Sequence, residues 1–373
     1  MTALALPRQR LAAAVIGALA LMGCAAGGLI DSTAFFAAWL VGWWACAGVV
    51  LGAQANLWLH ALTGGSWIDP LRQPLRRAAG AIAALSLLML PLFLAIHSMY
   101  PWASRDWAQG LSRPAFKTLW LEPGFVTVRL LAYVALWNAL IWLSRRGRRR
   151  PGRGDAGGPG KGYSAFGMLA LGYSVSLAAV DLVMALMPGW YSSDFGLLAI
   201  AMQMKAAFAL AVFRGARQAT PGQRRDLGNL LLMYVLMWGY LAFVQFQIIW
   251  AGNLPHEIAW YLPRMAPPWQ WLGLALIVAD FFLPLLLLLF RAFKENAKCL
   301  KALAGWLCLM GAMESAWLVL PSISALDPNI VWMCPLALVG MAALLWAGAA
   351  GVQRPRGPAL PDIGRQGAGH AGS

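Results

Sequence analysis

Residues 269–290 read WQWLGLALIVADFFLPLLLLLF, an apolar run in which Asp280 is the one charged side chain. A transmembrane helix needs about 20 consecutive apolar residues to cross a hydrocarbon core ~30 Å thick. This run therefore predicts a membrane-spanning helix. Similar runs recur along the chain, and the ten predicted spans are 11–30, 34–59, 77–99, 124–143, 163–187, 194–213, 227–250, 269–290, 301–320 and 330–350.

The composition of the whole chain agrees with these spans. Of its 373 residues 60% are hydrophobic and 12% are charged, and the mean hydropathy is +0.63. A soluble domain carries roughly 45–50% apolar and about 25% charged residues. The sequence therefore excludes a soluble enzyme, a secreted disulfide scaffold and a disordered chain. It predicts an all-α polytopic integral membrane protein, with residues 11–350 forming one ten-helix transmembrane domain.

The basic residues indicate the orientation of the chain. With ten spans, most of the 29 Lys and Arg fall on the face that holds both termini. The most basic loop, residues 144–162 (SRRGRRRPGRGDAGGPGKG), is predicted to be flexible because it is rich in Gly, Pro and Arg. By the positive-inside rule, residues 1–10 form a cytoplasmic N-terminus and residues 351–373 a disordered cytoplasmic tail. The net charge of +15 is thus a topology signal and a contact for anionic lipid, rather than a nucleic-acid surface.

The first span has two interpretations. Arg8, Arg10, an apolar run and then Leu21-Met22-Gly23-Cys24 resemble a bacterial lipoprotein cleavage signal. The apolar run continues through Leu29-Ile30, however, which favours an uncleaved first helix. Lipidation of Cys24 stays open. The five cysteines contain no C-x-x-C pair, so they support neither a disulfide framework nor a metal site.

A few ionisable side chains fall inside the predicted spans. A charged side chain at the bilayer centre is unfavourable by at least ~2.5–3.5 kcal/mol, so each one needs a partner or a function. They concentrate at mid-depth and in the half opposite the basic face, which predicts a half-channel or quinone-headgroup pocket open toward the periplasm. The candidates for proton transfer or a quinone site are Asp181, Lys205, Asp280, Glu314, His97 and Arg129.

The partners of these groups stay open at this point. Asp181 and Lys205 lie on consecutive spans and could form a buried ion pair with a structural role. Asp280 is either paired with Lys205 or protonated. The two histidines within the spans, His60 and His97, lie roughly 25–30 Å apart along the membrane normal. That separation excludes a haem with paired axial histidines.

Three segments carry a resemblance that goes beyond composition. They are residues 90–103 (LPLFLAIHSMYPWA), 181–196 (DLVMALMPGWYSSDFG) and 226–291, which includes IWAGNLPHEIAWYLPR at 249–264. Together they resemble the F-type, quinone-binding subunit 2-like membrane subunit of bacterial alternative complex III. That complex is a quinol:cytochrome c (or oxidase) oxidoreductase, and the subunit is related to the NrfD/polysulfide-reductase membrane subunits. The resemblance runs from about residue 50 to 320.

The resemblance implies ten helices in two four-helix bundles plus peripheral helices, in the bacterial inner (cytoplasmic) membrane. It implies no haem or iron–sulfur cluster in this chain, with quinone or quinol as a substrate of the complex. The implied partners are an NrfD-type membrane subunit and haem and iron–sulfur subunits. The outer-loop motif comprises Asn253, Pro255, Glu257 and Arg264. From the charges alone, Glu257 and Arg264 could pair across this loop. Asp280 departs from the family pattern, which has His there.

Two other functions stay open. The chain could be a non-catalytic structural or assembly subunit of such a complex or of a cytochrome oxidase, or a secondary transporter. Catalysis by this chain alone is not expected, because it has no group that accepts an electron. A transporter is expected to have interrupted helices in both halves, and only Pro284 indicates one.

Overall fold

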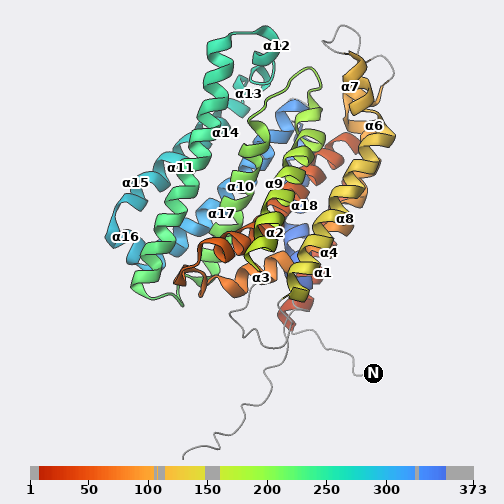
Figure 1. The fold of residues 1–373 in the computed structure, drawn as a ribbon. Coiled ribbons are helices and arrows are strands. Elements are labelled where there is room, and N and C mark those ends of the chain that lie inside the picture. Colours follow the sequence, from red (N-terminus) through yellow and green to blue (C-terminus); the bar gives the residue numbers. More distant parts are fainter. Residues whose placement is uncertain (1–7, 105–106, 108–113, 148–159, 324–326, 350–373) are drawn as a thin grey trace, which may run out of the picture.

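A computed structural model describes residues 8–104, 107, 114–147, 160–323 and 327–349, and these residues form helices and short connections (Figure 1). This part of the chain contains ten helices long and apolar enough to cross a membrane. They are Arg8–Gly27, Ser32–Thr63, Arg72–Leu94, Pro123–Arg146, Lys161–Leu186, Phe195–Gly215, Pro221–Gly252, Trp269–Leu289, Ala297–Ser322 and Pro328–Gly348. Each overlaps a predicted span, which confirms the all-α polytopic membrane fold.

Local signals set the ends of the two longest helices. Helix α2 (Ser32–Thr63) begins after Asp31, whose carboxylate accepts a hydrogen bond from the Ala34 backbone N–H at 2.9 Å. Helix α11 (Pro221–Gly252) begins with a capping box between Thr220 and Gln223. It ends at Asn253, which takes the left-handed conformation (φ 46°) that terminates many helices.

The third span is divided into short helices rather than forming one rod. Its segments are α3 (Arg72–Gly80), α4 (Ile82–Leu87), α5 (Leu90–Leu94) and α6 (Ile96–Met99). The expectation that only Pro284 marks an interrupted helix is therefore wrong, because helices are interrupted in both halves of the chain. The breaks at Ala81, Leu88 and Ala95 lie within an apolar run, so hydropathy alone gives no sign of them.

The eighth span contains a π-helical turn. Helix α14 (Trp269–Leu276) widens into η4 (Ile277–Phe282) and continues as α15 (Leu283–Leu289). Pro284 explains the widening, because it has no N–H to donate to the carbonyl of Asp280 and its ring crowds that carbonyl. A π turn adds the room that this contact needs. The turn contains Asp280 itself.

The ten spans form two groups of four and one outer pair. The first group consists of α2, the α3–α6 segments, α8 (Pro123–Gly147) and α9 (Lys161–Leu182). The second consists of α10 (Phe195–Gly215), α11, the α14–α15 span and α17 (Ala297–Val319). Helices α1 (Arg8–Gly27) and α18 (Pro328–Gly348) pack against each other beside α2. This matches the expected two bundles with peripheral helices.

Helices α2 and α10 join the two groups at very close range. A Cβ atom on Gly52 of α2 would lie 2.1 Å from the carbonyl oxygen of Gln203 on α10. Only glycine fits at that contact, as is common where membrane helices pack closely through small residues. The two central helices are therefore in contact along much of their buried length.

The two ends of the bundle differ in charge. We call the lower end in Figure 1, with α3, α16 (Arg291–Glu295) and the α10–α11 connection, the basic end. Its described basic residues include Arg8, Arg10, Arg72, Arg76, Arg77, Arg145, Arg146, Lys161, Arg214, Arg217, Arg224, Arg225, Arg291, Lys294, Lys298 and Lys301. The opposite end has α7 (Pro114–Trp120), α12 (Pro255–Ile258) and α13 (Leu262–Met265), with Lys117 and Arg264. This distribution agrees with the predicted charge asymmetry.

Some predictions fall on residues outside the described ranges. These are the first seven residues of the N-terminal segment 1–10, the tail 351–373 and positions 148–159 of the 144–162 loop. Arg105 and Arg113 are also outside them. Cys24 is described: it lies inside α1, fully buried against α18, with its thiol 3.8 Å from the Met333 carbonyl oxygen.

Candidate functional site

The second group of helices buries a cluster of three ionisable side chains. Lys205 of α10 lies between Asp280 of η4 and Glu314 of α17, and none is more than 3% exposed. Its Nζ atom is 2.5 Å from Asp280 Oδ2 and 3.5 Å from Glu314 Oε2. Of the two alternatives that the sequence left open for Asp280, the structure shows the pairing with Lys205. We call these three residues the Lys205 cluster.

Trp238 of α11 completes the surroundings of this cluster. Its indole N–H donates to Glu314 Oε1, and Lys205 Nζ lies 4.1 Å from the centroid of its ring. The indole therefore contacts a carboxylate through its N–H edge and the ammonium through its π face. All four helices of the group thus contribute a side chain to one buried polar site.

The Lys205 cluster has unequal charge and an incompletely bonded oxygen. One ammonium faces two carboxylates, so the formal charge is negative when all three groups are ionised. Asp280 Oδ1 is buried and has no hydrogen-bond partner among the described residues. A buried carboxylate oxygen without a donor is unfavourable by about 1–3 kcal/mol or more, and a bound proton removes that charge.

The first group of helices buries a second, separate ion pair. Arg129 of α8 binds the Asp181 carboxylate of α9 through Nε at 3.0 Å and Nη2 at 2.9 Å. Tyr133 Oη donates to the same carboxylate at 2.9 Å and Trp120 Nε1 at 3.2 Å. Four donors on two oxygens satisfy Asp181 completely. We call this the Arg129 cluster.

The structure therefore decides the partner of Asp181, which the sequence left open. Asp181 does not pair with Lys205, because Arg129 occupies both of its oxygens. Five of the six candidate residues form two separate clusters. Arg129 reaches Asp181 with its guanidinium 4.1 Å from the Trp120 ring centroid, so aromatic stacking fixes its direction.

His97 belongs to neither cluster. It lies exposed on the short helix α6, near the opposite end of the bundle. Its imidazole is thus on the surface of the transmembrane domain. This position agrees with the sequence, which places His97 at the outer end of its span. Within the described part of the chain, no three His, Cys, Asp or Glu side chains are grouped closely enough to hold a metal ion.

The outer-loop motif is organised around Arg264. Asn253 ends α11 and Pro255 begins α12, as the sequence indicates. Arg264 is 2% exposed, and its guanidinium donates to the Trp260 and Leu318 carbonyl oxygens at 2.7 and 2.6 Å. Burial lowers the pKa of Arg264 to about 9, so the group keeps its charge at neutral pH.

The pairing of Glu257 with Arg264 that the charges allow is therefore not formed. Arg264 turns inward to backbone carbonyls and to Ser322 Oγ at 2.8 Å, and the ring of Trp260 lies 3.6 Å beneath it. Leu318, which accepts from Arg264, is one helical turn from Glu314 on α17. The motif thus places a buried cation, Arg264, close to the Lys205 cluster, on the side of the cluster that faces α12 and α13.

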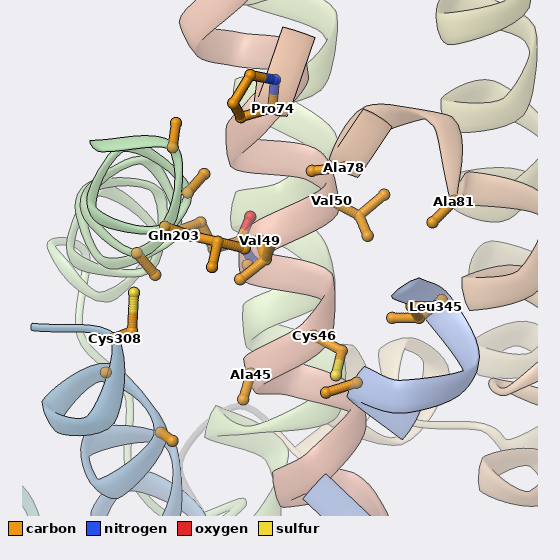
Figure 2. Close-up of a pocket in the computed structure, with 18 of the residues that line it drawn as sticks. Ala45, Cys46, Val49, Val50, Pro74, Ala78, Ala81, Gln203, Cys308 and Leu345 are labelled. Atoms are coloured by element: carbon orange, nitrogen blue, oxygen red, sulfur yellow. The ribbon is translucent and has the colours of Figure 1, made fainter. Parts of the chain in front are cut away.

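A cavity of about 680 Å³ approaches the Lys205 cluster from the basic end. In Figure 2, α2 runs through the middle of the view, with Cys308 of α17 on its left and Leu345 of α18 on its right. Pro74 of α3 lies near the top of the view. Polar residues line the cavity at its two extremes. They are Gln73, Arg77, Arg214 and Gln218 at the basic end and Gln203, Glu314 and Ser315 at mid-depth.

The side on which this cavity opens differs from the sequence-based expectation. The positions of the ionisable groups predict a pocket open toward the periplasm, whereas the cavity lies in the basic half of the bundle. Small side chains explain the space, because α2, α10 and α17 present Ala45, Ala206 and Ala312 toward it. The positions of charged residues cannot predict a cavity whose volume comes from small apolar side chains.

Several residues of the two clusters were not predicted. Tyr133 lies one turn after Arg129 on α8, so the spacing i, i+4 indicates that both reach the same partner. Trp238 carries no such signal, since nothing in the sequence relates it to Lys205. Two polar residues of α2 make interhelical hydrogen bonds: Gln54 Nε2 donates to Ser144 Oγ at 3.3 Å, and Tyr234 Oη donates to Asn56 Oδ1 at 2.7 Å.

Comparison with known proteins identifies no relative, because no protein-family model and no curated protein matches the chain. The resemblance to the alternative complex III subunit therefore stays an interpretation of the sequence.

Proposed function

We propose that this chain is an integral membrane subunit, without a cofactor of its own, of a respiratory quinol-oxidising complex, and that it binds and releases a proton at the Lys205 cluster. The observation that supports this is a single ammonium buried between two carboxylates. Buried charges of unequal number are unfavourable, and one bound proton makes the cluster neutral. In that step the carboxylate oxygen takes a proton from a quinol hydroxyl or a water molecule, whose O–H bond breaks as the new O–H bond forms, and no electron moves to this chain.

Asp280 is the proton acceptor in this proposal. Its Oδ1 atom has no donor among the described residues, whereas Glu314 receives the indole N–H of Trp238. Lys205 stabilises the ionised form once the proton leaves. The π turn of η4 gives Asp280 a backbone that can adjust by a small shift, since π turns are common at functional positions.

Polar groups continue from this cluster toward the opposite end of the bundle. Arg264 bonds to Leu318 one turn from Glu314, and Gln245 of α11 lies 3.4 Å from Ser192 nearby. We propose that the proton leaves on this side, which the positive-inside rule assigns to the periplasm. Electrons from quinol would pass to haem and iron–sulfur subunits beside an NrfD-type membrane subunit in the bacterial inner membrane.

The test uses the intact complex with Asp280→Asn and Glu314→Gln. Quinol-oxidation turnover is expected to fall by a factor on the order of 10², the usual contribution of a positioned proton-transfer group. The amount of assembled complex should stay close to wild type. Asp226→Asn is the matched control, because Asp226 is an exposed carboxylate at the basic end.

The second candidate function is a structural or assembly subunit, and the Arg129 cluster favours it. Asp181 has four hydrogen-bond donors, so that cluster can hold helices α8 and α9 in register without exchanging a proton. Unchanged turnover in Asp280→Asn and Glu314→Gln, with normal assembly, would contradict proton transfer and leave this second function.

A further inference from the structure

We propose that the cavity at the basic end binds one anionic phospholipid, with its phosphate between Arg77 and Arg214 and one acyl chain extending toward Glu314. This site does not rest on the proposed proton transfer. It follows from the charge of the cavity mouth, the character of its walls, its length and its opening.

The mouth of the cavity carries positive charge that is not neutralised locally. Arg77 of α3 and Arg214 of α10 line it together with Gln73 and Gln218. Both arginines are exposed, and neither has a hydrogen bond or ion pair with another described residue. No Asp or Glu lines the mouth, since Glu314 at the inner end is the one acid among the lining residues. Two free guanidinium groups with adjacent amides match the oxygens of a phosphate.

The walls beyond the mouth are apolar. Val49 and Val50 of α2, Leu210 of α10 and Leu338 of α18 line this chamber, with alanines between them. A free phosphate or nucleotide would leave such walls without a partner. A ligand that has an anionic head and a hydrocarbon chain covers both the mouth and the chamber.

The length of the cavity fits one leaflet of a bilayer. Its lining on α10 extends from Arg214 to Met202, which is roughly 18 Å along the helix axis. Half of a hydrocarbon core ~30 Å thick is ~15 Å. A lipid with its phosphate at the level of Arg214 therefore places its chain end at the level of Glu314.

The cavity is also open to the side. Leu309 of α17 and Trp346 of α18 line it and are 51% and 39% exposed. Both belong to membrane-spanning helices, so their exposed faces contact lipid. Helices α17 and α18 each pack against α2, which forms the back of the cavity (Figure 2). A phospholipid can therefore enter from the bilayer without passing through water.

The basic end is where anionic lipid is most abundant, if the positive-inside rule gives its side. Basic pockets between membrane helices on the cytoplasmic side are known to hold anionic headgroups, and each Lys or Arg near the surface contributes about 1 kcal/mol. The bound chain would also keep the basic side of the Lys205 cluster dry. That last consequence rests on the proposed function, and it would confine proton exchange to the opposite end.

The test measures lipid binding to the purified full chain by native mass spectrometry, with cardiolipin as the probe. Wild type is expected to bind one cardiolipin tightly, and Arg77→Gln/Arg214→Gln to bind it about 30-fold more weakly, from two lost charges. The matched control is Arg217→Gln/Arg225→Gln, which removes two exposed arginines at the same end that do not line the cavity. It should bind within about 2-fold of wild type.

A second variant tests the chamber separately from the mouth. Ala312 is half-buried on α17 and faces the cavity, so Ala312→Phe should block the acyl chain and weaken binding while both arginines remain. The proposal would be overturned if both double-arginine variants lost cardiolipin binding equally, or if wild type bound phosphatidylethanolamine as tightly as cardiolipin. Displacement of cardiolipin by a neutral quinone would also overturn it. None of these results depends on turnover, so they are distinct from a failure of the proposed function.

Discussion

The two groups of four helices each bury one ion cluster, and the clusters differ in balance. In the Arg129 cluster one cation meets one carboxylate, and Tyr133 and Trp120 bond to the oxygens as well. In the Lys205 cluster one cation meets two carboxylates, and Asp280 Oδ1 lacks a donor. A carboxylate that has one cation and four donors resists protonation, although Arg129 Nη1 has no acceptor among the described residues. A carboxylate in the unbalanced cluster can accept one proton and so make that cluster neutral.

The surroundings of the clusters differ in the same direction. Asp181 lies on the continuous helix α9, while Asp280 lies on the π turn of the eighth span. Glu314 borders a cavity, and the lining of that cavity includes no residue of the Arg129 cluster. The comparison teaches that two buried ion clusters made of the same types of side chain can differ in charge count, in backbone regularity and in access to a cavity, and the proposed proton transfer rests on these three differences.

The largest expected effect comes from breaking the balanced pair. Arg129→Met leaves the Asp181 carboxylate buried without its cation, and this should lower the free energy of unfolding by about 3–5 kcal/mol. Unfolding in mixed micelles measures it. The double variant Arg129→Met/Asp181→Leu should recover most of the loss, since an apolar pair of similar volume replaces a buried ion pair well. No recovery would show that the cluster acts beyond its charge.

A smaller loss of stability is expected at the unbalanced cluster. Asp280→Asn leaves Lys205 paired with Glu314, so charge is balanced and only one charged hydrogen bond is lost. The free energy of unfolding should fall by about 2–3 kcal/mol. Quinol-oxidation turnover should nevertheless fall strongly in Asp280→Asn. Asp280→Asn should therefore lose less stability than Arg129→Met but more turnover. A loss as large as that of Arg129→Met would contradict the difference.

The indole donors Trp238 and Trp137 provide a finer comparison, because one donates to a carboxylate and the other to a hydroxyl. Trp238→Phe removes the N–H that donates to the Glu314 carboxylate, with an expected loss of about 1.5 kcal/mol in unfolding free energy. Trp137→Phe removes a donor to the neutral hydroxyl of Ser174, at 2.9 Å, and should lose only about 0.5–1 kcal/mol. Equal losses would indicate that Glu314 is permanently protonated.

The smallest effect is a pH dependence at the start of α8, the helix that carries Arg129. Backbone N–H groups of Gly124 and Phe125 donate to the exposed Glu122 carboxylate and lower its pKa below its ordinary value. A carboxyl with a lower pKa in the folded chain stabilises it above the ordinary pKa, and this contribution is lost as pH falls through the lower value. Glu122→Gln should therefore remove a small acid-dependent loss of stability, measured by unfolding at several pH values.

The sequence alone located the ten spans and five of the buried ionisable residues, because apolar length and charge are local properties, whereas the sixth candidate, His97, is exposed. Arg129 and Asp181 lie on consecutive spans and were both candidates, yet the sequence did not pair them. The depth of a residue in the membrane follows from its position along the span. The partner of a side chain depends instead on which surfaces of the helices pack against each other. The contact of Trp238 with Glu314, the inward turn of Arg264 and the cavity are packing features, so no local pattern predicted them.

The central claim is that the Lys205 cluster exchanges a proton and the Arg129 cluster does not. Infrared difference spectroscopy of the protein in bilayers, across a pH titration, observes carboxyl groups directly by their C=O stretch. The claim predicts a protonated-carboxyl band that titrates in wild type, persists in Asp181→Asn and disappears in Asp280→Asn. A band that survives in both Asp280→Asn and Glu314→Gln, or that disappears in Asp181→Asn, would contradict it.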